Sequence, residues 1–255
     1  MFEIIICIIA GLGAGFGTGF AGMSAAAVIS PLLITFLHMD PYLAVGIALA
    51  SDVLASAASA ITYGKNKNLD IKNGIIMMIS VLCFTMVGSY VANMVPKTTM
   101  GNFSVFMTLL LGVKFIVKPV TEPKRRLLGA TAKQKAIRSV ACGAVVGFIC
   151  GFIGAGGGMM MLLVLTSVLG YELKTAVGTS VFIMSATALT GSVSHFVIGG
   201  MPDIKALVIC VVSTLVFAQI ASLLANKLPA KTLNRITGAI LVVLGIAVLG
   251  VNYLA

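Results

Sequence analysis

One acidic residue, Asp52, lies near the middle of an apolar run that extends over residues 41–63. If that run crosses a membrane, a carboxylate at its centre costs about 2.5–3.5 kcal/mol, and its default interpretation is functional. The chemistry open to it is coupling to a proton or a sodium ion, or contact with a substrate. The structural alternative is a protonated carboxyl group hydrogen-bonded to a neighbouring serine, for which Ser51, Ser56 and Ser59 are the nearby residues.

Two glycine-rich stretches, residues 11–22 and 151–158, could interrupt helices. Glycine permits broken helix geometry, and a helix that starts at a break points free N–H groups and partial positive charge outward, which suits an anion. The alternative is tight helix packing, which the four-residue spacing within residues 11–19 favours. Three adjacent glycines at 156–158 favour a binding turn instead. The predicted anion-binding residues here are Gly22, Ser24, Gly154, Gly156, Gly157 and Gly158.

Three further polar residues lie in the apolar run 173–199. The hydroxyl groups of Thr179 and Ser180 could bind an oxyanion, or could bond back to the preceding helical turn. His195, about one turn from the end of its segment, could carry a proton or contact an anion. A lone histidine at such a position is also commonly structural. All three are candidate substrate-binding residues.

Motifs for enzymatic chemistry are missing from the sequence. There is no Ser-His-Asp order, HExxH, phosphate-binding loop or metal-ligand cluster. The five cysteines lie within apolar runs, without a CxxC pair, so neither a disulfide framework nor a metal site is indicated. We therefore predict no catalytic residue, no metal and no cofactor.

The elements that must position these residues are membrane helices. The chain is 59% hydrophobic and 9% charged, far below the charge of a soluble domain, so lipid is its expected solvent. Tyrosines such as Tyr63 fall near the ends of apolar runs, where membrane interfaces favour them. The net charge of +10 fits basic cytoplasmic loops better than nucleic-acid binding. Apolar segments fall near residues 3–22, 24–37, 41–63, 72–95, 99–118, 136–153, 157–169, 173–199, 203–226 and 232–254.

The chain contains an internal repeat. Residues 15–46 match residues 147–178 at an offset of 132, and residues 70–96 match 203–229 at an offset of 133. An offset held nearly constant over about 80 residues predicts a duplicated unit. We expect a first repeat over 1–118, a basic cytoplasmic linker over 119–135 and a second repeat over 136–255.

The charges predict that the two repeats are inverted. Five segments per repeat is an odd number, which turns the second copy over. With the basic linker in the cytoplasm, fifteen of the seventeen lysines and arginines fall inside, and only Lys97 and Lys205 fall outside. The predicted fold is an all-α membrane protein of two inverted repeats with glycine-broken or re-entrant short helices, and with both termini outside.

The second repeat resembles the TauE/SafE family of sulfite and organosulfonate exporters. The resemblance rests on residues 151–158, on Ala-Val-Gly-Thr-Ser at 176–180, on His195 and on the turn at 199–203. The first repeat departs from the family pattern, with Gly-Ile-Ala at 46–48 and Tyr63 in place of the histidine. The resemblance implies transport of a sulfur oxyanion or sulfonate.

The expected function is therefore secondary transport of a small anion by alternating access, coupled to H⁺ or Na⁺ through Asp52. Inverted repeats with broken helices in corresponding positions are typical of such carriers, whose sites lie near the bilayer midplane. The alternatives are an anion channel and an intramembrane enzyme. The expected location is the cell membrane of a bacterium or archaeon, with no nucleic-acid partner; the sequence predicts no oligomeric state.

Overall fold

The computed structural model describes residues 1–92, 113, 116–117, 132–153 and 157–254, and the regular structure in this part of the chain is helical. The expected all-α class is confirmed over these residues, while the segment at 99–118 lies almost wholly outside them. The helices are α1 (Phe2–Ala21), α2 (Ala26–Leu37), α3 (Pro41–Lys65), α4 (Ile71–Ala92), α7 (Ala132–Ile153), α8 (Gly157–Leu163) with a π-helical turn at Val164–Val168, α9 (Leu173–Gly199), α10 (Ile204–Lys227) and α11 (Ala230–Leu254).

Six of the described helices are long and apolar enough to cross a membrane: α1, α3, α9 and α10, together with the described parts of α4 and α11. The 12 residues of α2 extend over about 18 Å, well short of a hydrocarbon core of about 30 Å. The 7 residues of α8 are shorter still. The two short apolar segments seen in the sequence therefore form helices of about half the spanning length or less. The chain is a multi-pass membrane protein.

Acidic residues begin two of the long helices. The carboxylate of Asp40 accepts N–H groups from Tyr42 and Leu43 at the start of α3, and that of Asp203 does the same for Lys205 and Ala206 at the start of α10. These side chains satisfy N–H groups that have no partner within the helix.

Glycines spaced by four residues bring α1 against α10. A Cβ atom at Gly11, Gly15 or Gly19 would collide with Ser213, Phe217 or Ala221 of α10 or with the backbone beside them. The packing interpretation of this stripe is therefore confirmed. At Gly143 and Gly147, α7 approaches the α4 backbone at Met77 and Val81 in the same way.

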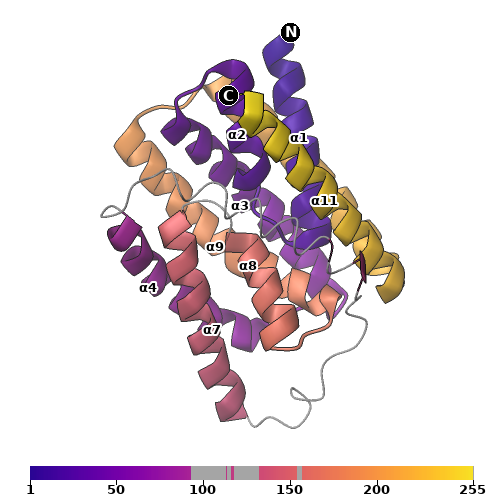
Figure 1. Cartoon of the computed structure of the whole chain (residues 1–255). Coiled ribbons are helices and arrows are strands. Elements are labelled where there is room, and N and C mark those ends of the chain that lie inside the picture. Colours follow the sequence, from indigo (N-terminus) through magenta and orange to yellow (C-terminus); the bar gives the residue numbers. More distant parts are fainter. Residues whose placement is uncertain (93–112, 114–115, 118–131, 154–156, 255) are drawn as a thin grey trace.

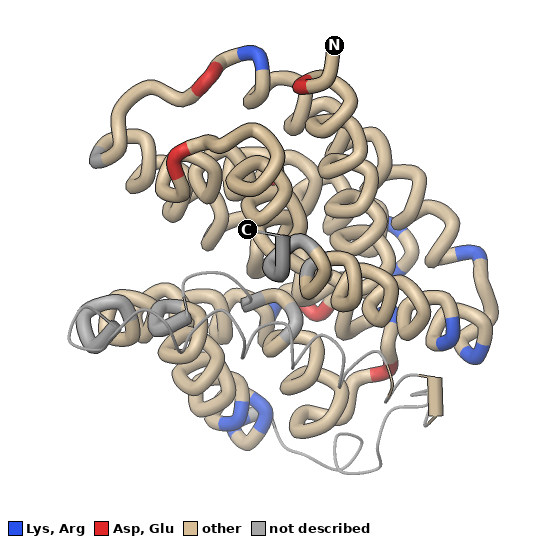
Figure 2. The backbone as a smooth tube through the Cα atoms, turned by 45° about the horizontal axis from the view of Figure 1, so that its top comes forward, with Lys and Arg blue, Asp and Glu red and all other residues tan. Residues whose placement is uncertain are grey.

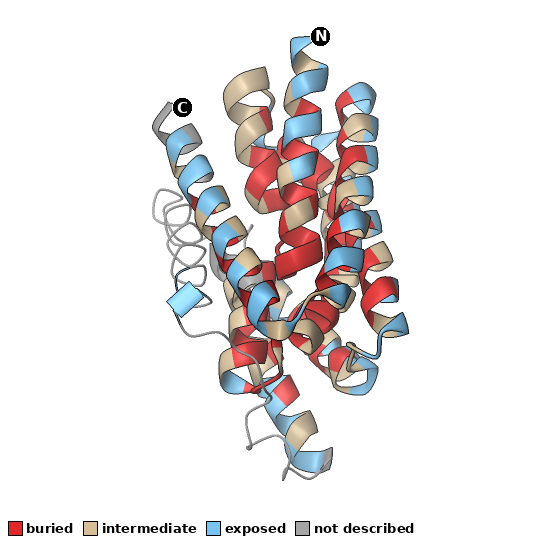
Figure 3. Cartoon of the chain, turned by 90° about the vertical axis from the view of Figure 1, so that its right-hand side faces the viewer, coloured by how far each residue is buried: buried red, intermediate tan, exposed pale blue. Residues whose placement is uncertain are grey.

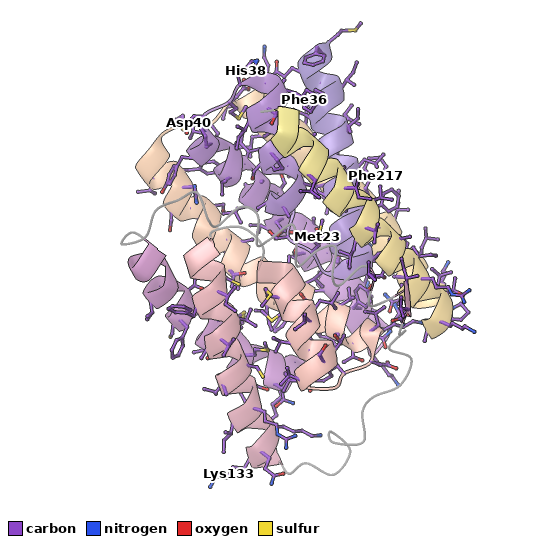
Figure 4. All side chains as sticks on the ribbon, viewed as in Figure 1. Met23, Phe36, His38, Asp40, Lys133 and Phe217 are labelled. Atoms are coloured by element: carbon purple, nitrogen blue, oxygen red, sulfur yellow. The ribbon has the colours of Figure 1, made fainter. Side chains whose placement is uncertain are left out.

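Three helix pairs, each with one helix from either half of the chain, form most of the packing. α1 packs along α10 and α4 packs along α7, while α3 and α9 pack against each other (Figure 1). α1 descends from the N-terminus at the top of the view, and α7 ascends from Lys133, which Figure 4 labels at the bottom. Both ends of the chain lie toward the top. Figure 3 shows buried residues on the inner faces of the helices and exposed ones outside.

Charge is distributed unevenly along the bundle. In Figure 2 most lysines and arginines gather at the end opposite the N-terminus, around the connections that join the helices there. By element, they belong to the α3–α4 connection, the first turns of α7 and α9, and the α10–α11 connection. These residues are Lys65, Lys67, Lys72, Lys133, Lys135, Arg138, Lys174, Lys227, Lys231 and Arg235. Lys205 belongs to the opposite end, at the start of α10.

Candidate functional site

The break between α1 and α2 lies in the interior of the protein. α1 ends at Gly22, whose left-handed backbone (φ 59°, ψ 34°) favours glycine. The N–H of Gly22 bonds to Thr18 O at 2.9 Å, and the N–H of Met23 to Gly17 O at 3.2 Å. Figure 4 places Met23 near mid-height of the bundle. The chain resumes as α2 at Ala26, whose N–H is 3.3 Å from Ser24 Oγ.

Hydroxyl groups from three other helices satisfy the carbonyl groups at the end of α1. A buried carbonyl without a partner would be costly, so a helix end in the interior needs such donors. The bonds run from Tyr63 Oη to Gly19 O (2.8 Å), from Thr237 Oγ1 to Phe20 O (3.1 Å) and from Ser180 Oγ to Gly22 O (3.1 Å). Residues of α3, α11 and α9 thus hold the break in place.

The carboxylate of Asp52 reaches the same break from α3, with 1% of the residue exposed. Its Oδ2 accepts the N–H of Ala25 at 3.2 Å, and its Oδ1 accepts the hydroxyl of Ser56 at 2.9 Å. Thr18 Oγ1 lies 3.5 Å from Oδ1. Among the described residues, no Lys, Arg or His forms an ion pair with it. The bond to a serine that a purely structural role of Asp52 would require is present. The carboxylate also contacts polar groups of α1 and of the α1–α2 break, which a purely structural role does not require.

The second glycine stretch meets the first at this point. A Cβ atom at Gly158, in α8, would lie 2.7 Å from Gly22 O and 2.7 Å from Ser24 N. Only glycine allows the α8 backbone to approach the break so closely. Gly157 begins α8, while Gly154 and Gly156 lie outside the described residues.

The structure therefore brings five of the predicted residues together. Their chain segments come from both halves of the protein: the α1–α2 break and α3 from the first, and α8 and α9 from the second. The five residues, which we call the break cluster, are Gly22, Ser24, Asp52, Gly158 and Ser180.

Thr179 lies apart from the break cluster, although it is adjacent to Ser180. Its Oγ1 accepts the N–H of Asp70 at 3.2 Å, in the α3–α4 connection. The carboxylate of Asp70 in turn accepts the hydroxyl of Tyr171 at 2.8 Å and the side-chain amide of Asn73 at 2.7 Å. Burial, and secondarily the bond to Asp70, raises the pKa of the Tyr171 phenol, so it stays a donor across the neutral range.

His195 lies at the opposite end of α9. Its Nδ1 is 2.9 Å from Tyr42 O, and its ring lies over the Tyr42 ring with centroids 4.1 Å apart. Both contacts join α9 to the start of α3, away from the break cluster. Thr179 and His195 therefore join the two halves at opposite ends of the α3–α9 pair.

Tyr63 corrects one expectation from the sequence. It was expected at a membrane interface, but it is fully buried and donates to Gly19 O. The signal was its spacing: residues 52, 56, 59 and 63 follow one face of α3, so Tyr63 shares the face of Asp52. Thr18 and Thr237 were also not singled out, because a lone threonine in an apolar run carries no distinctive pattern.

The chain matches proteins named as probable membrane transporters over most of its length. It is 27% identical to the probable membrane transporter protein YunE of Bacillus subtilis, across 95% of this chain and 96% of that protein. It is 25% identical to the probable membrane transporter protein MJ0441 of Methanocaldococcus jannaschii, across 96% and 94% of the two chains, and 21% identical to the B. subtilis protein YdhB, across 85% and 88%.

The family model described as "Sulfite exporter TauE/SafE" matches residues 7–248. That range contains all five residues of the break cluster. The family is one of transporters and not of enzymes, which agrees with the lack of enzymatic motifs in the sequence. The resemblance seen in the second repeat is thereby confirmed over most of the chain, and this multi-pass membrane protein belongs to the TauE/SafE sulfite exporter family of membrane transporters.

Proposed function

We propose that the protein is a secondary transporter that carries a small anion, a sulfur oxyanion such as sulfite or a small organosulfonate, by alternating access around the break cluster. The observation that carries the proposal is the meeting of two interrupted helical segments, one from each half, at a buried polar centre. Transporter sites are typically built from discontinuous helices in this way. The anion class follows from the family, whose description names sulfite export.

The start of α2 supports an anion at this place. One N–H group there already holds a carboxylate, since Ala25 N–H donates to Asp52, while the next N–H, of Ala26, donates to the Ser24 hydroxyl. A helix N-terminus that binds one oxyanion is suited to another. When Asp52 takes up H⁺ or Na⁺, its negative charge is neutralised and the N–H groups become available to the substrate. Gly22, Ser24, Gly158 and Ser180 would surround the anion, with Gly154, Gly156 and Gly157 in the adjoining turn.

Inverted repeats are part of the proposal. In the proposed repeat, α7 is the counterpart of α1, and α10 is the counterpart of α4. α1 and α7 run in opposite directions, and the pair α1–α10 becomes the pair α7–α4 when each helix is replaced by its counterpart. Both observations support repeats over 1–118 and 136–255 that are joined by a cytoplasmic linker at 119–135. The gathering of basic residues at one end supports that end as cytoplasmic and both termini as outside.

Accessibility labelling tests this topology. With single cysteines introduced in residues 65–72 and 227–235 of a cysteine-free chain, a membrane-impermeant reagent should label both regions from the cytoplasmic face of inverted vesicles. A cysteine at Met1 should react only in right-side-out cells. Labelling of the two loops from opposite faces would overturn the inversion.

Alternating access also needs contacts that close each end. The basic end is closed by bonds between halves, from Tyr171 to Asp70 and from Asn68 Nδ2 to Asn226 Oδ1 at 2.7 Å. The opposite end is closed by His195 on Tyr42. We propose that Thr179 and His195 serve in these closures, beside any contact with the passing anion.

Tyr171→Phe should weaken closure of the basic end. The change removes one half-buried hydrogen bond to a carboxylate, worth about 1.5 kcal/mol, and so shifts the open fraction about tenfold. A cysteine at Ser180, in a cysteine-free chain, should then react about ten times faster with an impermeant reagent applied from the cytoplasmic face. Tyr42→Phe is the matched control, because Tyr42 makes its contacts through its carbonyl and ring. Equal rates in the two variants would contradict this closure.

Flux in proteoliposomes tests the function. Purified protein should accumulate labelled sulfite when a proton or sodium gradient is applied, and a small organosulfonate should compete. Failure to move sulfite or any small sulfonate would refute the substrate class. Voltage-driven currents far above carrier turnover would favour an anion channel instead.

A further inference from the structure

We infer that the coupling ion is sodium, and that Asp52, Ser56, Thr18 and the carbonyl of Met23 form its binding site. The inference rests on the proposed function, for which it names the cation. Four oxygen atoms form a continuous chain at the α1–α2 break. Ser56 Oγ lies 2.9 Å from Asp52 Oδ1, which lies 3.5 Å from Thr18 Oγ1, which lies 2.9 Å from Met23 O.

The spacing of these oxygens suits one cation between them. Oxygen ligands of Ca²⁺ lie at about 2.3–2.6 Å from the ion, and Na⁺ has nearly the same radius. Neighbouring ligands at right angles are then about 3.3–3.7 Å apart. The observed separations are equal to or slightly shorter than this, because the hydroxyl groups of Thr18 and Ser56 now point their hydrogens at acceptors. Rotation of two hydroxyl groups would present lone pairs to an ion without movement of the backbone.

The charge at the site calls for one monovalent cation. Asp52 is buried without a basic partner among the described residues, and an isolated buried charge is expensive. One carboxylate balances a single positive charge. The Met23 carbonyl lies just beyond the C-terminal end of α1, where the helix dipole contributes partial negative charge. Carboxylate, hydroxyl and carbonyl oxygens are the donors that hard cations prefer.

A second, independent observation comes from the next turn of α3. Ser59 is fully buried, and its hydroxyl has no hydrogen-bond partner within the part of the chain that the structure describes. It lies seven residues from Asp52 and three from Ser56, and so on the same face of the helix. Leaving such a hydroxyl unsatisfied is costly in a purely structural setting. As a further oxygen between the site and the basic end of α3, it gives the ion a path toward that end.

A proton alone leaves most of this arrangement unexplained. It would occupy one oxygen of Asp52 and one acceptor. Oδ2 already accepts the N–H of Ala25, and protonation of Oδ1 toward Ser56 needs neither Thr18 nor the Met23 carbonyl. Sodium uses all four oxygens.

Thermal unfolding in detergent tests the site without any transport. The melting temperature of the wild-type protein is measured across a NaCl series at constant ionic strength, with KCl or choline chloride as the balancing salt. We expect a saturable rise with Na⁺ and none with K⁺ or choline, because only a ligand of the folded state stabilises it in this way. Asp52→Asn should abolish the rise.

Single-oxygen variants identify the ligands. Thr18→Val and Ser56→Ala should each weaken Na⁺ affinity about tenfold, the scale of one lost contact to a charged group. Ser51→Ala is the matched control: Ser51 is fully buried beside Asp52, but its hydroxyl donates to Ile47 O, so its Na⁺ response should remain wild-type.

The outcomes separate this inference from the proposed function. Equal melting temperatures of the wild-type protein in Na⁺ and K⁺, or an unchanged Na⁺ response in Asp52→Asn, would overturn the sodium site. Sulfite flux driven by a proton gradient and indifferent to Na⁺ would also overturn it, while leaving the transport function intact. Sodium binding without flux of any sulfur oxyanion would leave the site intact and refute the proposed function.

Discussion

Asp52→Asn is expected to abolish coupled transport while the protein still inserts and folds. The substitution keeps the shape of the side chain. An amide oxygen can accept the N–H of Ala25, and the amide NH₂ can donate to Ser56, so the bonds at the break are preserved. What is lost is the negative charge that binds the cation. At about 1.5–3 kcal/mol for an interaction with a charged group, we expect gradient-driven uptake to fall about 10- to 100-fold.

The measurement is initial sulfite uptake into proteoliposomes under an imposed cation gradient, with reconstituted protein quantified. Ser51→Ala serves as control, since it removes a neighbouring buried hydroxyl outside the break cluster and should retain flux within about twofold of wild type. Wild-type flux in Asp52→Asn would show that the carboxylate has only the structural role of holding the start of α2.

Gly158→Ala is expected to cost both stability and transport. A methyl group at this position would lie 2.7 Å from Gly22 O, from Ser24 N and from the sulfur of Met184. The sulfur can move aside, but the two backbone atoms belong to the break itself. Overpacking of this kind costs about 1–3 kcal/mol and would push α8 away from the break. We expect a lower melting temperature, and loss of flux even at temperatures where the variant remains folded.

Gly250→Ala provides the matched control for this substitution. Gly250 lies in α11, and among the described residues no atom outside its own helical turns lies within 4 Å of the Cβ that the change would add. Alanine there should leave flux unchanged and should slightly favour the helix. If Gly158→Ala behaved like Gly250→Ala, the close approach of α8 to the α1–α2 break would be irrelevant to function.

The two substitutions probe different parts of one mechanism. Asp52→Asn alters charge at a fixed geometry, whereas Gly158→Ala alters geometry at a fixed charge. A carrier in which two broken helices meet around an ion needs both the charge and the geometry. The double variant should therefore transport no better than either single variant, and the two losses should not simply add. Independent partial effects that add would instead place the two residues in separate roles.

Much of the fold followed from local pattern. The lengths and positions of the helices agree with the apolar segments to within a few residues, because hydrophobic runs of spanning length must satisfy their backbone within a helix. Asp40 and Asp203 begin helices where capping residues are expected. The four-residue spacing of Gly11, Gly15 and Gly19 predicted a packed stripe, since such residues share one helix face.

Part of the candidate site also followed from the sequence alone. Asp52, Gly22, Ser24 and Gly158 could be singled out because a carboxylate within an apolar run and a cluster of glycines are costly in a membrane helix and therefore informative. Thr179 and Ser180 could not be told apart. They are neighbours on α9 and so point about 100° apart, one toward the α3–α4 connection and the other toward the break.

Only the tertiary structure decided which side chains close around the break. Tyr63, Ser180 and Thr237 reach the end of α1 from positions 44, 158 and 217 residues away from their acceptors. Residues that distant in the sequence meet through helix packing, and although spacing can show which face of a helix packs, neither hydropathy nor spacing shows which other helix it meets. The sequence determined that helices break and where. Folding determined that the α1–α2 break, Gly158 of α8 and the carboxylate of Asp52 share one buried centre, because a broken helix end inside a membrane protein must find its hydrogen-bond partners on other helices.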